Sequence, residues 1–151
     1  MYYYDCKRDE NFENEFGVGF ISSLDELMKI TDIVSIHIPL CEDTKYLINE
    51  NNLKLMKNTA YLINTSRGAV VNENDLVMFL KNNKIRGAAL DVFENEPLIT
   101  EDLFKMENVI LTPHIAASSD EAHKTMIEMA IKNVVEVMSD QRPSNIVKEC
   151  L

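Results

Sequence analysis

Three side chains that can bind and protonate an oxo acid follow three short apolar runs: Arg67, Glu96 and His114. A guanidinium is planar and always charged, and it can bind a carboxylate through two parallel hydrogen bonds, so an arginine here suits the orientation of an α-keto acid. An imidazolium can protonate a carbonyl oxygen while hydride arrives at the carbon, and the neutral ring can take the proton back in oxidation. Together these residue types favour hydride chemistry on a 2-oxo acid.

The partner expected for His114 is a carboxylate in the preceding segment. A histidine acid works best when a carboxylate holds its second nitrogen, because the charged form is then favoured and the pKa of the ring rises. Glu96 is the candidate, and Glu94 is the nearby alternative, since side-chain directions in this turn cannot be read from sequence. Two plainer interpretations stay open: Arg67 as a surface cation and His114 as a hydrogen-bonded loop histidine.

The other two histidines are weaker candidates for catalysis. His37 lies in an apolar run, where burial disfavours the charged ring, so we interpret it as a core or strand-end histidine. His123 lies within a helical pattern, and we expect it to be solvated.

The signals for a dinucleotide are mixed. Asp5 follows the first apolar run, where a carboxylate can accept hydrogen bonds from an adenosine ribose and disfavours the extra phosphate of NADP, so it favours NAD. Lys7 and Arg8 weaken this inference, because either could neutralise a phosphate. The chain contains no Gly-x-Gly-x-x-Gly turn: within Gly17–Ser22 the third glycine is replaced by serine, and the glycines precede a short strand instead of joining a strand to a helix.

Short apolar, β-branched runs recur along the chain, each bounded by polar or turn residues. Such runs predict strands that are buried on both faces. The predicted strands are Met1–Tyr4, Val18–Ile21, Ile33–Ile38, Thr59–Ile63, Ile85–Leu90 and Val109–Leu111.

Helical patterns separate most of these strands. Ser23 begins a helix with a capping-box pattern that reaches about Ile30, and Asn72 caps a second helix. Ser118–Glu121 begins the longest helix, which reaches about Met138. Alternation of strands and helices without hairpin dipeptides predicts an α/β fold with a mostly parallel sheet and with functional groups at the carboxyl ends of the strands.

Composition excludes several classes of protein. A formal charge of −10 over 151 residues argues against nucleic acid or an anionic membrane as a partner. No apolar run approaches the ~18 residues of a membrane span, and no secretory leader is visible, so we expect a cytoplasmic protein. Cys6, Cys41 and Cys150 are far apart and odd in number, which predicts free thiols and neither a disulfide framework nor a metal site.

The motifs occur in a fixed order along the chain: the Ser-Leu-Asp-Glu-Leu helix start, Asp32–Leu40, Thr44, Asn64–Val71, Leu90–Pro97 and Thr112–Ala117. In type and order they resemble the nucleotide-binding half of the D-isomer-specific 2-hydroxyacid dehydrogenases, which include phosphoglycerate dehydrogenase, glyoxylate/hydroxypyruvate reductase and D-lactate dehydrogenase. The resemblance implies that Arg67 binds the substrate carboxylate, that Glu96 holds the histidine and that His114 is the proton donor.

The same resemblance implies NAD as cofactor, a small 2-hydroxy or 2-oxo acid as substrate, and a homodimer in the full-length form. The residues it implies in contact with NAD are Asp5, Ile38, Thr65, Ser66, Arg67, Asp91, His114, Ile115, Ala116 and Ala117.

In the family, a substrate domain, a boundary helix and a first strand with its glycine turn precede the matched region. We therefore expect a Rossmann-like doubly wound parallel sheet that is truncated, with the first strand and the glycine-rich turn missing. Residues 1–117 would form a partial NAD-binding domain, and residues 118–151 a C-terminal helix and tail that in the family returns to the substrate domain. Because the first strand is central in the order 3-2-1-4-5-6, the strands at Met1–Tyr4 and Ile33–Ile38 would both face an empty slot.

Three interpretations follow. The first is an NAD-dependent dehydrogenase of D-2-hydroxy acids, represented by its carboxyl-terminal half. The second is a non-catalytic remnant that senses NAD or binds a protein partner, since dehydrogenase-like folds can be reused. The third is a shortened gene model, for which the DNA upstream of Met1 would encode the glycine turn.

Overall fold

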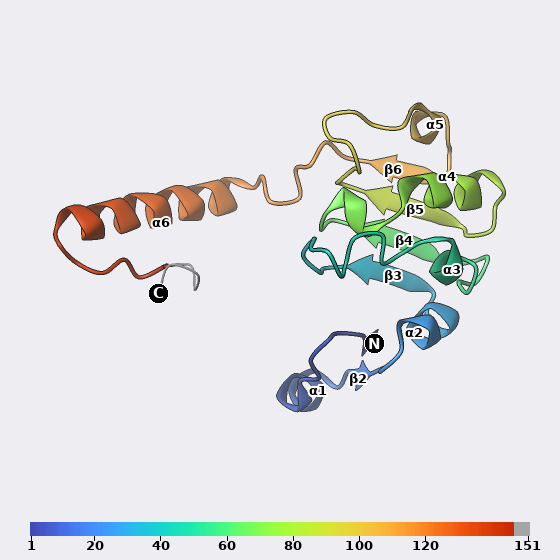
Figure 1. Ribbon diagram of the computed structural model, residues 1–151, viewed down its shortest axis with the longest axis horizontal. Helices are drawn as coiled ribbons and strands as arrows, with labels where there is room; N and C mark the ends of the chain where they lie inside the picture. Colours follow the sequence, from blue (N-terminus) through green and yellow to red (C-terminus); the bar gives the residue numbers. More distant parts are fainter. Residues whose placement is uncertain (147–151) are drawn as a thin grey trace. The chain divides into compact units, whose positions relative to one another are not determined.

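The computed structural model describes residues 1–146, which divide into one compact unit of Met1–His114 and a second that begins at Ile115. Helices and strands alternate, which confirms the predicted α/β class (Figure 1). The elements of the first unit are β1 (Tyr2–Tyr3), α1 (Glu10–Phe16), β2 (Gly19–Phe20), α2 (Leu24–Ile30), β3 (Ile33–Ile36), α3 (Glu50–Leu53), β4 (Tyr61–Asn64), the 3-10 helix η1 (Gly68–Val70), α4 (Glu73–Lys81), β5 (Gly87–Leu90), α5 (Glu101–Phe104) and β6 (Val109–Leu111). The second unit contains α6 (Asp120–Met138).

The caps predicted from sequence begin three of these helices. The side chain of Ser23 accepts a hydrogen bond from the amide of Glu26 at 3.4 Å, and that of Asn72 accepts one from Asp75 at 3.2 Å. Ser119 caps α6 through the amide of Ala122 at 3.1 Å. Each cap satisfies an amide that has no partner within its own helix, which explains why the helices start at these positions.

The main sheet is parallel, with strand order β3-β4-β5-β6. Its register places Ile36, Asn64, Leu90 and Leu111 opposite one another in one row. The loops that follow β4, β5 and β6 therefore leave the same edge of the sheet, and these loops contain Arg67, Glu96 and His114.

Within the first unit, Met1–His114, only one face of this sheet is covered. Leu62, Val34 and Leu90 are buried on the face that packs against the helices, whereas Ile33, Tyr61 and Ile110 are 60%, 45% and 68% exposed on the other. The prediction that the strands are buried on both faces is therefore wrong for β3, β4 and β6. The physical reason lies in the topology: β3 to β6 follow one another in one direction, and right-handed crossovers then place every connecting helix on the same side.

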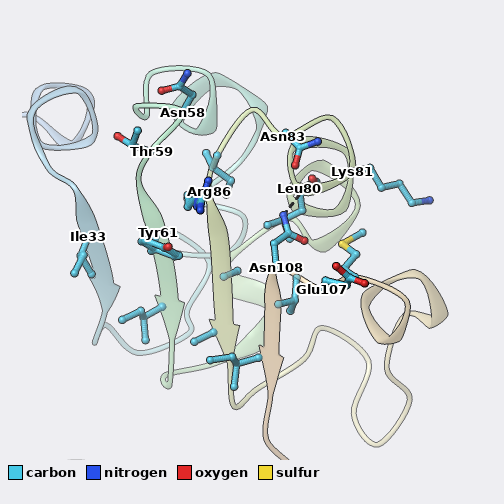
Figure 2. Close-up of a pocket in the computed structure, with 17 residues that line it drawn as sticks. Ile33, Asn58, Thr59, Tyr61, Leu80, Lys81, Asn83, Arg86, Glu107 and Asn108 are labelled. Atoms are coloured by element: carbon cyan, nitrogen blue, oxygen red, sulfur yellow. Dashed lines mark hydrogen bonds between the residues drawn. The ribbon is translucent and has the colours of Figure 1, made fainter.

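The uncovered face is hollowed by a cavity of about 1180 Å³. Figure 2 shows Ile33 and Tyr61 on neighbouring strands of this face, with Asn58 and Arg86 toward the amino ends of the strands. None of the predicted catalytic side chains lines this cavity, because they lie beyond the carboxyl ends.

A second parallel sheet contains only β1 and β2. In the described part of the chain, β1 pairs only with β2, and β3 pairs only with β4. Each of the two strands therefore has one unpaired edge. A cavity of about 580 Å³ lies between the two sheets, lined by Tyr2 and Tyr4 on one side and by Val34 and Ile36 on the other. The structure thus confirms the predicted slot between these two strands.

The backbone of β1 shows which groups face away from β2. The carbonyl oxygens of Met1 and Tyr3 accept hydrogen bonds from β2 and the residue after it, at 3.1 and 2.8 Å. Because polar groups of successive residues alternate between the two edges of a strand, those of Tyr2 and Tyr4 point to the opposite edge. That edge can pair with one further strand.

Gly17 and Gly19 do not form a phosphate-binding turn. Gly17 ends α1 in the left-handed region, with φ of 62°, and Gly19 lies in β2. Gly17 thus precedes a short strand, as the sequence indicated, and it ends a helix that the sequence did not predict. None of the helices among residues 1–146 is both long enough and apolar enough to span a membrane.

Candidate active site

The turn that carries Arg67 is shaped by Asn64, the last residue of β4. The buried Asn64 amide donates to the carbonyl oxygen of Arg67 at 3.0 Å and accepts from the amide of Ser66 at 3.1 Å. These bonds hold a turn of four residues, and they leave the Arg67 side chain exposed, with Nη1 donating to the Ser66 carbonyl oxygen at 2.7 Å.

Gly68 joins this turn to the loop after β5. A Cβ atom at Gly68 would lie 1.9 Å from the carbonyl carbon of Phe93 and 2.4 Å from the amide nitrogen of Glu94. No side chain fits there, so glycine is required for the two backbones to approach this closely. The contact fixes the Arg67 turn against the segment that carries Glu96.

Glu96 and His114 form a hydrogen-bonded pair. His114 Nδ1 lies 2.8 Å from Glu96 Oε2, and the amide of Phe93 donates to Glu96 Oε1 at 2.9 Å. The side chain of His114 is 50% exposed and that of Glu96 is 35% exposed, so the far nitrogen of the ring remains accessible. The carboxylate therefore holds the imidazole by Nδ1.

The electrostatics of Glu96 place all three predicted catalytic groups in one neighbourhood. The pKa of the Glu96 carboxyl lies below its ordinary value, because His114 and the Phe93 amide hydrogen-bond to the charged form. The positive charge of Arg67 lowers this pKa further. The structure thus places Arg67, Glu96 and His114 in the loops that follow β4, β5 and β6 at one edge of the sheet, with Glu96 and His114 in direct contact.

The alternative carboxylate points elsewhere. Glu94 accepts a hydrogen bond from the hydroxyl of Tyr46 at 2.5 Å and lies against the start of α4. Among the described residues, Glu96 and not Glu94 is the partner of His114.

His114 itself is held in an uncommon backbone conformation. Its φ is 55°, in the left-handed region, and its amide donates to the carbonyl oxygen of Thr112 at 3.0 Å. Thr112 in turn donates from its hydroxyl to the buried carboxylate of Asp91 at 2.6 Å. These contacts bind the start of the His114 loop to the end of β5.

The residues implied in NAD binding fall into two groups. Asp5, Ile38, Thr65, Ser66 and Asp91 all follow carboxyl ends of strands in the first unit, together with Arg67 and His114. The hydroxyl of Ser66 donates to the carbonyl oxygen of Ile38, which links the loops after β3 and β4. Ile115, Ala116 and Ala117 are the first residues of the second unit.

The residues at this edge fit a dinucleotide in part. The exposed carboxylate of Asp5 accepts from the amide of Lys7 at 3.0 Å, and this bond keeps the Asp5 pKa below its ordinary value, so the group is an anionic acceptor for ribose hydroxyls. Arg8 is held by Glu13 through two hydrogen bonds of 2.8 Å. Residues 1–146 contain no Gly-x-Gly-x-x-Gly turn, which in this type of fold binds the pyrophosphate. In the strand order 3-2-1-4-5-6 this turn follows the central strand, whose position corresponds to the slot between β1 and β3.

The remaining sequence candidates lie outside this cluster. His37 follows β3, exposed, with Nε2 2.8 Å from the Ser35 hydroxyl, which makes it a strand-end histidine. His123 is exposed in α6, as expected. Cys6 and Cys41 are exposed free thiols, and Cys150 lies outside the described residues. Residues 1–146 contain no cluster of three or more histidine, cysteine, aspartate or glutamate side chains that could hold a metal ion.

Two features that support the site were missed from sequence: Asn64 and the buried Glu73, which contacts the loop of Glu96. An asparagine at the end of an apolar strand was a usable signal, because such a side chain can bond its own backbone two residues on. A glutamate at the start of a helix gives no such signal, because most are solvated.

Comparison with known proteins assigns the chain to a family. Residues 1–116 match the family model described as D-isomer specific 2-hydroxyacid dehydrogenase, NAD binding domain. The chain belongs to the D-isomer specific 2-hydroxyacid dehydrogenase family. Arg67, Glu96 and His114 all lie within the residues that match the NAD-binding domain of this family.

Individual members of the family are similar over almost the whole chain. The glyoxylate reductase of Thermococcus litoralis is 44% identical over 147 residues, which cover 97% of this chain and 44% of that protein. A D-isomer specific 2-hydroxyacid dehydrogenase from Lactobacillus delbrueckii ssp. bulgaricus, solved in its NAD-complexed form, superposes with a TM-score of 0.85 at 33% identity, over 97% of this chain and 48% of that one.

A third relative carries the phosphorylated cofactor. The NADPH-dependent glyoxylate/hydroxypyruvate reductase of Sinorhizobium meliloti, solved with NADP and malonate, gives a TM-score of 0.90 at 31% identity, over 97% of this chain and 45% of that one. The 151 residues span less than half the length of these dehydrogenase relatives.

Proposed function

We propose that this chain supplies the NAD-binding and proton-transferring half of a reductase that interconverts a 2-oxo acid and a D-2-hydroxy acid. The observation that carries the proposal is the Glu96–His114 pair beside the Arg67 charge at one edge of the sheet. Glyoxylate reductases among the relatives support a small 2-oxo acid of the glyoxylate class as substrate.

Each of the three side chains has one task in this reaction. The exposed guanidinium of Arg67 binds the substrate carboxylate and so orients the keto group. Nε2 of His114 gives a proton to the carbonyl oxygen in reduction and removes it in oxidation. Glu96 holds Nδ1 and stabilises the charged ring. NAD supplies the hydride acceptor and NADH the hydride donor.

The cofactor would be held by Asp5 at the ribose and by the loops of Ile38, Thr65, Ser66 and Asp91, with Ile115–Ala117 following the catalytic histidine. NAD is favoured over NADP because Asp5 is an anion and because Arg8, the nearest arginine in the chain, is occupied by Glu13. The pyrophosphate turn would come from a strand outside residues 1–151 that enters the slot between β1 and β3.

The proposal retains the homodimer that the family resemblance implies. It is supported by the apolar side chains exposed on the open face of the main sheet, among them Ile33 and Ile110. Light scattering after size-exclusion chromatography measures the assembly of the active form.

The test combines the chain with the strand it is proposed to accept. A synthetic peptide of five β-branched residues followed by Gly-x-Gly-x-x-Gly is mixed with residues 1–151, and NADH oxidation is followed with glyoxylate, hydroxypyruvate and pyruvate in turn. We expect turnover with at least one acid, and loss of turnover in Arg67→Gln. A complex that binds the peptide and NADH but reduces none of the three acids would contradict the proposal.

That negative result would favour the second candidate, a non-catalytic module that senses NAD or binds a partner. The observation in favour of this candidate is the apolar slot itself, whose lining includes Val34 and Ile36 at the free edge of β3. An edge strand beside an apolar groove can bind an extended segment without any chemistry.

A further inference from the structure

Two glutamates outside the catalytic trio bind each other's backbones. The amide of Glu94 donates to Glu73 Oε2 at 3.0 Å, and the amide of Glu73 donates to Glu94 Oε2 at 3.3 Å. Glu94 lies in the loop after β5, two residues before Glu96, whereas Glu73 is the first residue of α4. The exchange therefore ties the catalytic loop to a helix of the core.

The other oxygen of each carboxylate is also satisfied. The hydroxyl of Tyr46 donates to Glu94 Oε1 at 2.5 Å, and the hydroxyl of Thr100 donates to Glu73 Oε1. Each of the four oxygens thus has a donor, and the donors come from four segments of the chain. Glu73 is only 7% exposed, and a buried carboxylate is tolerated when its oxygens are hydrogen-bonded in this way.

Tyr46 extends the network to the substrate-binding turn. Its amide donates to the carbonyl oxygen of Ala69 at 2.8 Å, two residues after Arg67. The hydrogen bond to Glu94 is also the main reason that the pKa of the Tyr46 hydroxyl lies above its ordinary value, so this hydroxyl stays a donor.

The network holds the backbone at Phe93 and Glu94. Glu73 binds the amide of Glu94, the carbonyl group of Phe93 packs against Gly68, and the amide of Phe93, in the preceding peptide group, donates to Glu96 Oε1 at 2.9 Å. Movement of this short backbone segment would change both the orientation of Glu96 and the packing of the Arg67 turn. We propose that Glu73 is a positioning residue, which acts through the backbone of Glu94 to aim Glu96 at His114.

This inference rests on the proposed function for its catalytic meaning, but its structural content can be measured without turnover. The readout is the pKa of the Glu96 carboxyl, followed by carbon-13 NMR of the side-chain carboxyl in the 151-residue chain. In Glu73→Ala we expect this pKa to rise toward the ordinary value of a glutamate, because the Phe93 amide and His114 no longer meet the carboxylate in the same geometry. Hydrogen exchange at the amides of Phe93 and Glu94 should become faster.

The matched control is Glu10→Gln, at the first residue of another helix, α1, where the side chain is 75% exposed. It should leave the Glu96 pKa and both exchange rates unchanged. If Glu73→Ala does not fold, Tyr46→Phe removes only one donor from Glu94 and should move the Glu96 pKa in the same direction by a smaller amount. An unchanged Glu96 pKa in whichever of these two variants retains the native amide spectrum overturns the inference.

Kinetics separate this inference from the proposed function. In a form that reduces an oxo acid, Glu73→Gln should lower kcat by roughly tenfold, with less change in KM, because misplaced catalytic groups slow the chemical step more than they weaken binding. If Glu73→Ala shifts the Glu96 pKa but no form of the protein reduces an oxo acid, the positioning role of Glu73 is supported and the proposed reductase function is contradicted. Normal kcat together with an unchanged Glu96 pKa would reject the positioning role and retain the enzyme.

Discussion

The carboxyl edge of the main sheet and the slot beside β3 differ in how their polar groups are satisfied. At the carboxyl edge, Asn64, Asp91 and Glu73 are buried and bonded to neighbouring loops. At the slot, the outward edges of β1 and β3 have no strand partner among residues 1–146, and the lining is largely apolar. The residues of the first unit thus hold the Glu96–His114 pair through their own contacts, whereas the edges of β1 and β3 that face the slot are unpaired within residues 1–146.

The largest expected effect is on turnover at the carboxyl edge. In a reductase-active form, His114→Asn and Arg67→Gln should each lower kcat/KM by roughly 10²- to 10⁴-fold, because one removes the proton donor and the other the carboxylate clamp. Steady-state kinetics with glyoxylate and NADH measure the loss. His37→Asn is the matched control, since His37 lies outside the cluster, and it should remain near the wild-type rate.

The second effect concerns stability and compares Gly68, at the carboxyl edge, with Gly17, at the end of α1. Gly68→Ala should lower the free energy of unfolding by more than about 3 kcal/mol, because the new Cβ would overlap the Phe93 carbonyl group. Gly17→Ala, with φ of 62° but open space around it, should cost only about 1–2 kcal/mol. Urea titrations of both variants decide the order, and equal costs would contradict the close packing of the two catalytic loops.

The third prediction tests the slot. A peptide of five β-branched residues followed by a glycine turn should raise the thermal midpoint, by an amount that corresponds to ~2.7 kcal/mol when its free concentration is 100 times Kd. A peptide with every backbone nitrogen methylated cannot donate to the free edge of either β1 or β3, and it should not stabilise the chain. Equal stabilisation by both peptides would show apolar adhesion in place of strand pairing.

How far the sequence could predict these regions differs between them. The order of strands along the chain and the helix starts near Ser23, Asn72 and Ser118 follow from apolar runs and capping residues, which are local signals. The choice of Glu96 over Glu94 in the catalytic trio came from the family resemblance. The helices α1, α3 and α5 were not predicted, since four to seven residues are too few to show helical periodicity.

Other features depend on contacts distant in sequence. Glu94 and Glu96 are two residues apart, and only the fold shows that one bonds to Tyr46 and the other to His114. The prediction that the strands are buried on both faces was wrong for a related reason. An apolar run indicates that both faces of a strand are apolar, but it does not show whether residues 1–146 cover both faces of the sheet.

The smallest effect is the pH dependence of stability. The folded-state pKa of Glu96 lies below the unfolded value of about 4.3, so its interactions stabilise the fold fully above that pH and are lost as pH falls through the folded-state pKa. The difference in unfolding free energy between wild type and Glu96→Gln should therefore shrink below about pH 4. A difference that stays constant from pH 6 to well below that point, on the order of pH 2, would contradict the linkage.

The convergence of Arg67, Glu96 and His114 is tested most directly by titrating the Glu96 carboxyl, by carbon-13 NMR, in the wild type, in Arg67→Gln and in His114→Asn. The account predicts a wild-type pKa below the ordinary value, a rise in both variants, and a larger rise when the imidazole is removed than when the guanidinium is removed. A Glu96 carboxyl that titrates at its ordinary pKa in all three proteins would show that the three groups do not share one site.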